Sequence, residues 1–427
     1  MQLNNCHKTP YTGVFLILKL NHYIIISLTI SLRPHQQRAL DSMVSDDKGQ
    51  IIVPTGGGKT YIMIQDALNQ FQKSIPQTIV VVAPRILLAQ QLCRDFMEYC
   101  DADVLHVHSG KSEYLNTTKH DEITQWFHNS TNNQLIFTTY HSLHKLQECL
   151  DVEVDTVYYD ESHNSVARSF FESTKYFSGY ATRNYFFTAT PRISRKHERG
   201  MHNVEVYGTV ICNVKAQELI ESGTILPPTI VPFNTEKPKE DSIIDIIDNA
   251  YDDGVLKVLV SVPSSKVLGK MLGQTSLLEE LKERDINVLH VTSKFGAYVN
   301  DKKVSRHEFL ATLHEWSKDD TISFVCFHYS ILSEGINVSG LTHTIMLRYL
   351  SVVEMAQTIG RVIRLDSDDR NRINSGELAP MNWKMYNKPT GYVTVPVHPK
   401  TKHIVKRLQK VVDAIFVDGQ PPVSLVT

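Results

Sequence analysis

The feature of this sequence that most constrains its fold is a repeated alternation of short apolar runs with segments of helical period. The runs are rich in valine, isoleucine and tyrosine, and polar or small residues end each of them. Such alternation is typical of a parallel sheet whose connecting helices cover its faces, so it predicts an α/β fold. The expected strands span residues 51–53, 78–84, 135–139, 155–161 and 184–190 in a first series, and residues 255–263, 286–292, 321–327 and 342–348 in a second.

The length of the chain also favours more than one domain. It has 427 residues, and single hydrophobic cores stop growing at roughly 250 to 300 residues. A Pro-rich, charged break near residues 222–235 separates the two series of strands. We therefore expect an N-terminal extension (1–30), a first domain (31–226), a second domain (227–400) and a C-terminal tail (401–427).

Composition narrows the class of protein. The chain has 44 basic and 46 acidic side chains, which argues against a polycationic nucleic-acid binder but allows local basic grooves. Its six cysteines form no Cys-x-x-Cys pair, so neither a disulfide scaffold nor a zinc ribbon is expected. A reducing, intracellular setting fits best, in the cytoplasm or wherever the genome is replicated.

An apolar segment, residues 13–30, could suggest a membrane span. Lys19, Asn21 and His22 interrupt its centre, where polar and charged groups are costly in a bilayer. A pair of β-strands or a poorly ordered extension is therefore the preferred interpretation, and membrane association is not expected.

The segment VPTGGGKT follows an expected strand and precedes a segment of helical period. Three glycines let backbone N–H groups crowd around an anion, and a helix beginning at Lys59 would add its positive dipole end. This context predicts a phosphate-binding loop in which Lys59 reaches the β and γ phosphates of a nucleotide and Thr60 binds Mg²⁺. The match is to a variant, because Val53 stands where the general motif has glycine, and the alternative is a glycine-rich turn with a surface lysine. The residues expected to hold the nucleotide here are Thr55, Gly56, Gly57, Gly58, Lys59 and Thr60.

Two adjacent carboxylates, Asp160 and Glu161, end an expected strand in the segment DESH. Without other evidence, such a pair could simply be solvated and contribute to solubility. Beside a phosphate loop, Asp160 can hold Mg²⁺ through its water shell, and Glu161 can orient and deprotonate the water that attacks the γ phosphate. We expect Lys59, Asp160 and Glu161 to be catalytic.

The segment QTIGRVIR carries two arginines with helical spacing. Arg361 and Arg364 are expected one turn apart on one helix face, and no carboxylate at i±4 can pair with both. An external anion such as the γ phosphate would then be their partner, with Gln357 on the same segment also catalytic. The alternative is a solvated basic helix face.

In this order, VPTGGGKT, DESH, TAT (188–190) and QTIGRVIR resemble motifs I, II, III and VI of superfamily 2 helicases and nucleic-acid translocases, over roughly residues 31–370. The chain is most similar to the branch that contains type III restriction translocase subunits and DExH-box repair helicases. The resemblance implies two tandem RecA-like domains with parallel sheets flanked by helices. It also implies an ATP hydrolase that uses ATP and Mg²⁺ and binds nucleic acid.

Further segments resemble motifs of that branch. LRPHQ resembles an Arg-Pro-aromatic-Gln motif, which implies that Gln36 reads the adenine edge, with His35 in the aromatic position. APRILLAQQ resembles motif Ia, which implies that Arg85 contacts the nucleic-acid backbone. TTYHSL stands where another strand-contacting motif is expected, with Thr139 as its candidate.

The resemblance also implies residues that couple hydrolysis to movement, namely His163, Thr188 and Thr190; His163 could instead be only a polar strand end. ILSEGINV resembles motif V, with Asn337 where many relatives carry aspartate. An asparagine can still donate and accept a hydrogen bond at that position.

The interpretation is an ATP-dependent nucleic-acid helicase, expected to act on DNA rather than RNA. Hydrolysis in a cleft between the two domains would change how strongly they close and would hand a strand along. Two alternatives stay open, a duplex DNA translocase subunit of a restriction-type system and an ATP-gated nucleic-acid clamp with little turnover. Two basic stretches, 190–199 and 399–410, could lie against nucleic acid or could be solvated.

Overall fold

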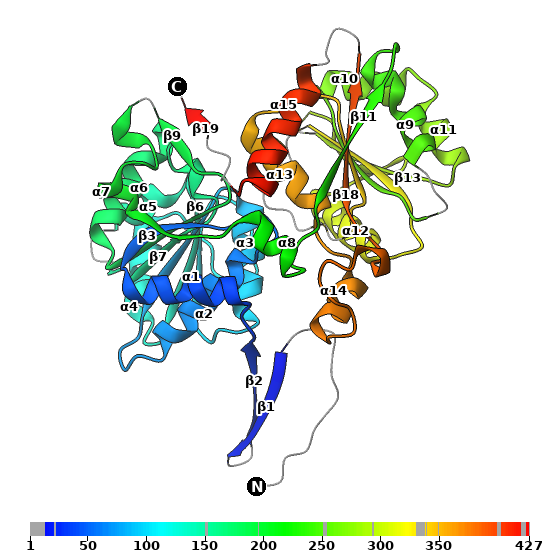
Figure 1. The fold of residues 1–427 in the computed structure, drawn as a ribbon. Helices are drawn as coiled ribbons and strands as arrows, with labels where there is room; N and C mark the ends of the chain where they lie inside the picture. The colour runs from blue at the N-terminus through cyan, green and yellow to red at the C-terminus, as the bar shows by residue number, and fades with distance from the viewer. Residues whose placement is uncertain are drawn as a thin grey trace. The chain divides into compact units, whose positions relative to one another are not determined.

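The structure is a computed structural model (Figure 1), and it falls into two compact units. The first comprises Met1–Val53, Gly58–Val214 and Ser424–Thr427, and the second comprises Pro54–Gly57 and Lys215–Val423. The second unit thus begins at Lys215, ahead of the break on which the expected boundary at residue 227 was based. The described residues are 13–20, 23–149, 153–194, 196–250, 254–292, 294–329, 338, 340–348, 350–398, 403–419 and 424–426.

The first unit is built on a seven-stranded sheet in the order β10-β3-β8-β7-β4-β6-β5, and every neighbouring pair is parallel. All residues of four of its inner strands, β4, β6, β7 and β8, are buried, as a sheet covered on both faces requires. The strands are β3 (Lys48–Ile52), β4 (Thr78–Ala83), β5 (Asp103–Val107), β6 (Gln134–Thr139), β7 (Thr156–Tyr159), β8 (Arg183–Thr188) and β10 (Thr209–Asn213).

Two groups of neighbouring helices accompany this sheet. The helices α1, α2 and α3 contact one another in series, and so do α4, α5, α6 and α7. Their bounds are α1 (Pro34–Ser45), α2 (Lys59–Phe71), α3 (Ile86–Met97), α4 (His120–Asn129), α5 (Leu143–Gln147), α6 (Arg168–Tyr180) and α7 (Val204–Tyr207). The five strands expected in the first series coincide with β3, β4, β6, β7 and β8, which confirms the parallel α/β prediction.

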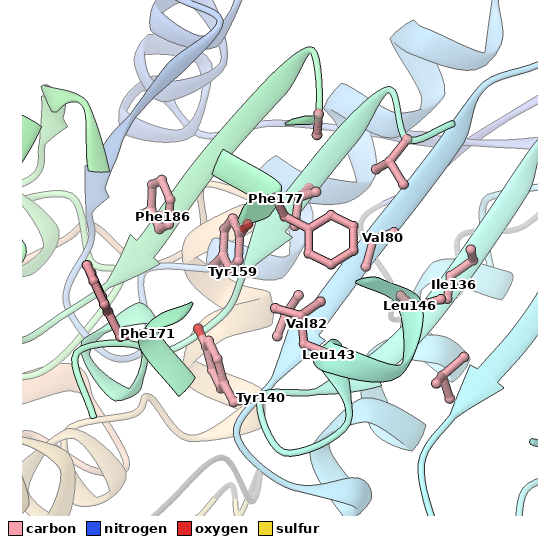
Figure 2. Packing of buried hydrophobic residues seen from close by; sticks show 14 of the residues in the cluster. Val80, Val82, Ile136, Tyr140, Leu143, Leu146, Tyr159, Phe171, Phe177 and Phe186 are labelled. Carbon is pink, nitrogen blue, oxygen red and sulfur yellow. The ribbon is translucent and has the colours of Figure 1, made fainter. Parts of the chain in front are cut away.

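The core on one face of this sheet includes residues of β4, β6, β7 and β8 (Figure 2). The rings of Tyr159 and Phe186 stack with centroids 4.4 Å apart and an interplanar angle of 7°. Phe171 and Phe177 of α6 belong to the same buried cluster. Tyr140 is a further member, and its hydroxyl donates a hydrogen bond to the carbonyl oxygen of Asp160 (2.9 Å). The core therefore supports the end of the strand that leads into the segment DESH.

The second unit has an eight-stranded sheet in the order β11-β18-β17-β12-β16-β13-β14-β15. It is parallel from β11 to β13, and the hairpin β14–β15 adds two antiparallel strands at one edge. The four strands expected in the second series coincide with β12, β13, β16 and β17. The strands are β11 (Pro228–Asn234), β12 (Lys257–Ser261), β13 (Asn287–Thr292), β14 (Gly296–Val299), β15 (Lys302–Val304), β16 (Phe324–His328), β17 (His343–Met346) and β18 (Gly391–Val397).

The helices of the second unit bury a second core, which includes Val258, Val260, Val325 and Phe327. Two parallel α/β units in tandem are the RecA-like arrangement that the motif resemblance implies. The helices are α8 (Ala216–Glu221), α9 (Ile243–Ala250), α10 (Ser265–Gly273), α11 (Leu277–Glu283), α12 (Arg306–Lys318), α13 (Val352–Val362), α14 (Ser367–Asn374) and α15 (His403–Val412).

The Pro-rich break differs from its expected role as a connection. It contains β11, which pairs in parallel with β18 along its whole length. Pro228 and Pro232 are compatible with this because β11 is the edge strand and needs hydrogen bonds on one side only.

The two ends of the chain add short strand pairs. The apolar N-terminal segment forms the antiparallel pair β1 (Gly13–Leu20) and β2 (Tyr23–Ile30), which confirms the interpretation as two strands. Across the described part of the chain, no helix is long and apolar enough to cross a membrane. Near the C-terminus, β19 (Ser424–Val426) pairs in parallel with β9 (Arg192–Ser194) of the first unit.

Candidate active site

The expected phosphate loop connects β3 to α2, and its glycines adopt a backbone conformation that other residues avoid. Gly56 and Gly58 have φ angles of +89° and +80°, in the left-handed region that costs other residues roughly 1–2 kcal/mol. Helix α2 begins at Lys59, directly after Gly58. The N–H of Val53 donates to the carbonyl oxygen of Thr188 (3.0 Å), so the loop starts beside the segment TAT.

Gln36 lies against this loop. Its Oε1 accepts a hydrogen bond from the N–H of Arg33 (2.8 Å), and its Nε2 donates to the carbonyl oxygen of Gly58 (3.2 Å). The side chain is buried and connects the start of α1 to the start of α2. Its contact with adenine stays a prediction.

Lys59 and Glu161, which are far apart in the sequence, meet at the carboxyl edge of the sheet. The distance from Lys59 Nζ to Glu161 Oε1 is 3.5 Å, and both side chains are only 11% exposed. Burial by itself would raise the pKa of Glu161, but the charge of Lys59 and a hydrogen bond with His163 lower it below its usual range. Glu161 is therefore ionised at neutral pH and able to accept a proton.

Asp160 behaves in the opposite way to its neighbour. Burial and repulsion from Glu161 raise the pKa of Asp160, and Lys59 opposes this only in part. A divalent cation beside Asp160 would relieve both effects. The adjacent carboxylates thus have different electrostatic roles, one ready to accept a proton and one suited to a metal ion.

The backbone at Glu161 is strained. Its φ of 45° lies in the left-handed region, which is rare for a residue with a side chain. The short helix η1 (Ser162–Asn164) follows, and Asn164 Nδ2 donates to the carbonyl oxygen of Glu161 (3.0 Å). Together with the Tyr140 bond to Asp160, this contact fixes both carboxylate residues. Such strain is concentrated at functional sites.

His163 links the carboxylates to the segment TAT. Its Nδ1 lies 3.0 Å from Thr188 Oγ1, 3.2 Å from Thr190 Oγ1 and 3.3 Å from Glu161 Oε2. The N–H of Thr190 in turn donates to Thr188 Oγ1 (3.0 Å). The structure therefore brings together all three residues expected to couple hydrolysis to movement, and that role stays a prediction.

The residues expected to bind Mg²⁺ are compatible with that ion. Thr60 supplies a hydroxyl in the first turn of α2, and Asp160 supplies a buried carboxylate, which are the hard oxygen ligands Mg²⁺ prefers. Within the described residues no group of three or more His, Cys, Asp or Glu side chains could hold a metal. A phosphate-loop magnesium site needs no such group, because phosphates and water supply the other ligands.

The arginines of QTIGRVIR lie in the second unit, and one expectation about them is wrong. Helix α13 carries Gln357 and Arg361 but ends at Val362, so Arg364 lies beyond it. Arg364 instead forms an antiparallel bridge with Ile225, and the N–H of Leu226 donates to the carbonyl oxygen of Ile363 (2.7 Å). The helix ends here because the backbone of residues 363 and 364 pairs with residues 225 and 226 instead.

Positive charge is concentrated around Arg364. Burial, followed by the charges of Arg361 and Arg370, lowers the pKa of Arg364 to about 9, which leaves it charged at neutral pH. Lys388 Nζ donates to the carbonyl oxygen of Arg364 (2.8 Å). Arg361 also lowers the pKa of His328, although burial is the main cause there.

The expected nucleic-acid contacts follow two paired strands. Arg85 is exposed and precedes α3, directly after β4, whereas Thr139 ends β6 and is buried. Ala83 at the end of β4 pairs with Thr139 at the end of β6, so Arg85 and Thr139 lie at the carboxyl ends of neighbouring strands. Asn337 of the motif V segment lies outside the described residues, as do 195 and 399–402 of the basic stretches.

Two residues that support the site were not expected from the sequence. Tyr140 and Asn164 each bond a backbone carbonyl oxygen of the carboxylate pair. Tyr140 follows an apolar strand, where a ring is expected for packing alone, and Asn164 directly follows DESH, where only its polarity signals a turn.

Comparison with known proteins confirms the resemblance drawn from the motifs. Residues 29–193 match the family model described as type III restriction enzyme, res subunit. The matched residues are those that carry the candidate nucleotide site, so this part of the chain is similar to that family. No curated protein matches the sequence.

Solved structures share the fold of the whole chain at low identity. The type ISP restriction-modification enzyme LlaBIII bound to DNA has a TM-score of 0.70 at 16% identity, covering 96% of this chain and 32% of that one. A fragment of an HsdR subunit of a type I restriction enzyme from Vibrio vulnificus YJ016 scores 0.59 at 17%, covering 92% and 68%. Mss116p bound to ssRNA and AMP-PNP scores 0.59 at 15%, covering 92% and 74%. The chain spans about a third of the LlaBIII chain and more of the other two.

The glycine geometry makes a prediction about stability. Gly58→Ala should lower the free energy of unfolding by at least about 1–2 kcal/mol, because alanine is strained at positive φ and its Cβ would collide with the amide of Gln36. Gly179→Ala is a matched control, since Gly179 is exposed in α6 and has open space around it. Alanine should stabilise that helix by about 0.5 kcal/mol. Urea unfolding midpoints that shift in the same direction for both variants would contradict this account of the loop.

Proposed function

We propose that this chain is an ATP-dependent nucleic-acid helicase that acts on DNA and couples ATP hydrolysis to movement along a strand. The observation that carries the proposal is the buried meeting of Lys59, Asp160 and Glu161 beside a glycine loop that begins a helix. A lysine at a helix N-terminus suits polyphosphate, and the ionised glutamate suits a base for water. The fold is also that of proteins solved with nucleotide and nucleic acid bound.

In this mechanism the first unit binds ATP and activates water. Lys59 and the N–H groups of the loop would bind the phosphates, and Thr60 and Asp160 would hold Mg²⁺. When bound, Mg²⁺ would neutralise charge on the phosphate oxygens. Glu161 would accept the proton of the attacking water. His163 contacts both Glu161 and Thr188, so a change at the carboxylate would reach the TAT segment.

The second unit would contribute positive charge during transfer. Arg361 and Arg364 are proposed to stabilise the charge that develops on the γ phosphate, with Gln357 on the same segment as a further catalytic residue. Because an anion favours the state in which it meets these arginines, binding and hydrolysis of ATP would alternate the conformations of the two units. Nucleic acid contacted through Arg85 and Thr139 would then be moved.

A specific observation favours a second candidate. The family match over residues 29–193 is to the subunit of a restriction enzyme, so the chain could move on duplex DNA without separating its strands. A clamp with little turnover is disfavoured because Glu161 is ionised and lies beside Lys59.

Glu161→Gln tests the assigned base. The variant keeps the shape of the side chain but loses its basicity, so ATP binding should persist while turnover falls by at least about 100-fold. Glu172→Gln is the matched control, because Glu172 is an exposed residue of α6 and the same change there should leave turnover intact. Steady-state phosphate release and nucleotide titration measure the two effects. Normal turnover by Glu161→Gln would remove this residue from the role.

The nature of the nucleic acid and of the movement can be tested together. ATP turnover should rise on addition of single-stranded or duplex DNA and rise less with RNA of the same sequence. Strand displacement would support the helicase, whereas displacement of a third strand from a triplex without unwinding would support the duplex translocase. A turnover that no nucleic acid stimulates would contradict both.

Arg361→Ala and Arg364→Ala test the contribution of the second unit. Each change should lower turnover by about 10³-fold or more, on the scale of known arginine fingers, and should leave ATP binding largely intact. Arg306→Ala is the control, because Arg306 is an exposed residue of α12 in the same unit. Equal turnover in all three variants and the unchanged protein would show that the arginines take no part in transfer.

A further inference from the structure

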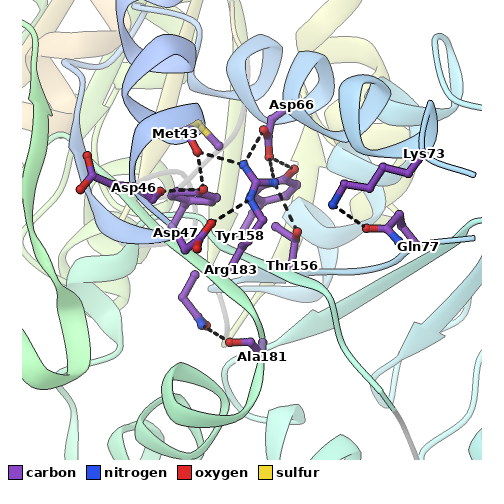
Figure 3. Close-up of polar contacts among 12 residues, drawn as sticks. Met43, Asp46, Asp47, Asp66, Lys73, Gln77, Thr156, Tyr158, Ala181 and Arg183 are labelled. Atoms are coloured by element: carbon purple, nitrogen blue, oxygen red, sulfur yellow. Dashed lines mark hydrogen bonds and ion pairs between the residues drawn. The ribbon is translucent and has the colours of Figure 1, made fainter. Parts of the chain in front are cut away.

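A buried ion pair between Asp66 and Arg183 connects α2 to β8 (Figure 3). Arg183 Nη1 donates to Asp66 Oδ2 and Nη2 donates to Asp66 Oδ1, both at 2.8 Å. Asp66 is fully buried, and Arg183 is 7% exposed. A two-bond guanidinium–carboxylate contact is geometrically specific, because the planar fork tolerates little displacement.

The same two side chains also contact β7, α1 and a second residue of β8. The hydroxyl of Tyr158 donates to Asp66 Oδ2 (2.6 Å), and Arg183 Nη2 donates to the carbonyl oxygen of Met43 at the end of α1 (3.1 Å). The guanidinium also lies over the ring of Tyr185 on β8, 4.9 Å from its centroid. The pair is thus satisfied on all sides within the described residues.

These contacts fall on the elements that carry the candidate active site. Asp66 is seven residues after Lys59 in α2, which places both on one side of the helix about two turns apart. Tyr158 is two residues before Asp160, at the end of β7. Arg183 begins β8, and that strand ends at Thr188, which contacts His163.

The composition of α2 makes a purely stabilising role a poor explanation. Ile62, Met63, Ile64 and Ala67 are buried on this helix, so packing alone could hold it against the sheet. A buried ion pair is commonly no more stabilising than well-packed apolar residues of similar volume. Apolar packing tolerates small changes in the rotation and axial position of a helix more readily than a two-bond fork does.

We propose that Asp66 and Arg183 are positioning residues for ATP hydrolysis, whose ion pair sets the register of α2 against β7 and β8. The register of α2 in turn sets where Lys59 lies relative to Asp160 and Glu161. The assignment of the reaction rests on the proposed function, whereas the register itself is a property of the folded first unit.

The test replaces the pair by apolar residues in the full chain, as Asp66→Leu combined with Arg183→Met. Thermal unfolding should show only a moderately lower midpoint, because no buried charge is left alone although the hydroxyl of Tyr158 loses its acceptor. The turnover of ATP, measured well below that midpoint, should fall by about 10-fold to 100-fold, since a misplacement of about 1 Å can cost about 100-fold in rate. Normal turnover in this double variant would overturn the proposal.

Two single variants test the proposal in case the double variant does not fold. Arg183→Lys keeps the charge and loses the fork, so turnover should fall at least about 10-fold even if the double variant does not fold. Turnover equal to that of the unchanged protein would then overturn the proposal. Tyr158→Phe removes one bond to Asp66 and keeps the fork, and it should hydrolyse ATP within about 2-fold of normal. A loss as large as that of the double variant would show that the fork is not what sets the register.

Hydrogen exchange separates this inference from the proposed function. In the double variant without nucleotide, exchange of the amides of α2 should rise, whereas exchange in β4, which the pair does not contact, should stay unchanged. This result would support the register even if the unchanged protein hydrolysed no ATP, in which case only the proposed function would fail. Unchanged exchange in α2 would overturn the register.

Discussion

The buried contact between Lys59 and Glu161 is the interaction on which the rest of the site depends. Each charge is nearly out of water, and a buried charge left without its partner typically destabilises a protein by 3–5 kcal/mol. The two residues come from the first turn of α2 and from the end of β7, and only the parallel sheet brings these points together. The order of strands, the glycine loop and the strained backbone at Glu161 can all be understood as conditions for this one contact.

The same contact separates the properties of two adjacent carboxylates. Burial by itself would raise the pKa of Glu161, but the charge of Lys59 and the contact with His163 lower it. For Asp160, burial and the neighbouring negative charge raise the pKa. A pair of carboxylates made unlike by their surroundings is the usual basis for distinct acid, base and metal-binding roles.

Much of this was readable from the sequence, because buried parallel strands are uniformly apolar and end in polar residues. Two of the strands missed by that reasoning break the pattern: β5 includes Asp103 and His106, and β11 contains two prolines that only an edge position tolerates. The position of Arg364 depended on a pairing with Ile225, more than 100 residues away, which no local spacing reports. Asp66 was missed for a related reason, since one carboxylate in an amphipathic helix is indistinguishable from its solvent face until its partner is known.

The arginines of the second unit have different electrostatic surroundings from the ion pair of the first. In the first unit the lysine and the glutamate compensate each other, whereas in the second unit burial, followed by the charges of Arg361 and Arg370, lowers the pKa of Arg364. Lys388 is held by its bond to the Arg364 carbonyl oxygen, and burial lowers its pKa to about 7, with the charge of Asp366 opposing this decrease. An anion bound beside Arg364 would favour the charged form of its guanidinium. In the proposed mechanism this anion is the γ phosphate of ATP, and the free energy of ATP hydrolysis gives each cycle its direction.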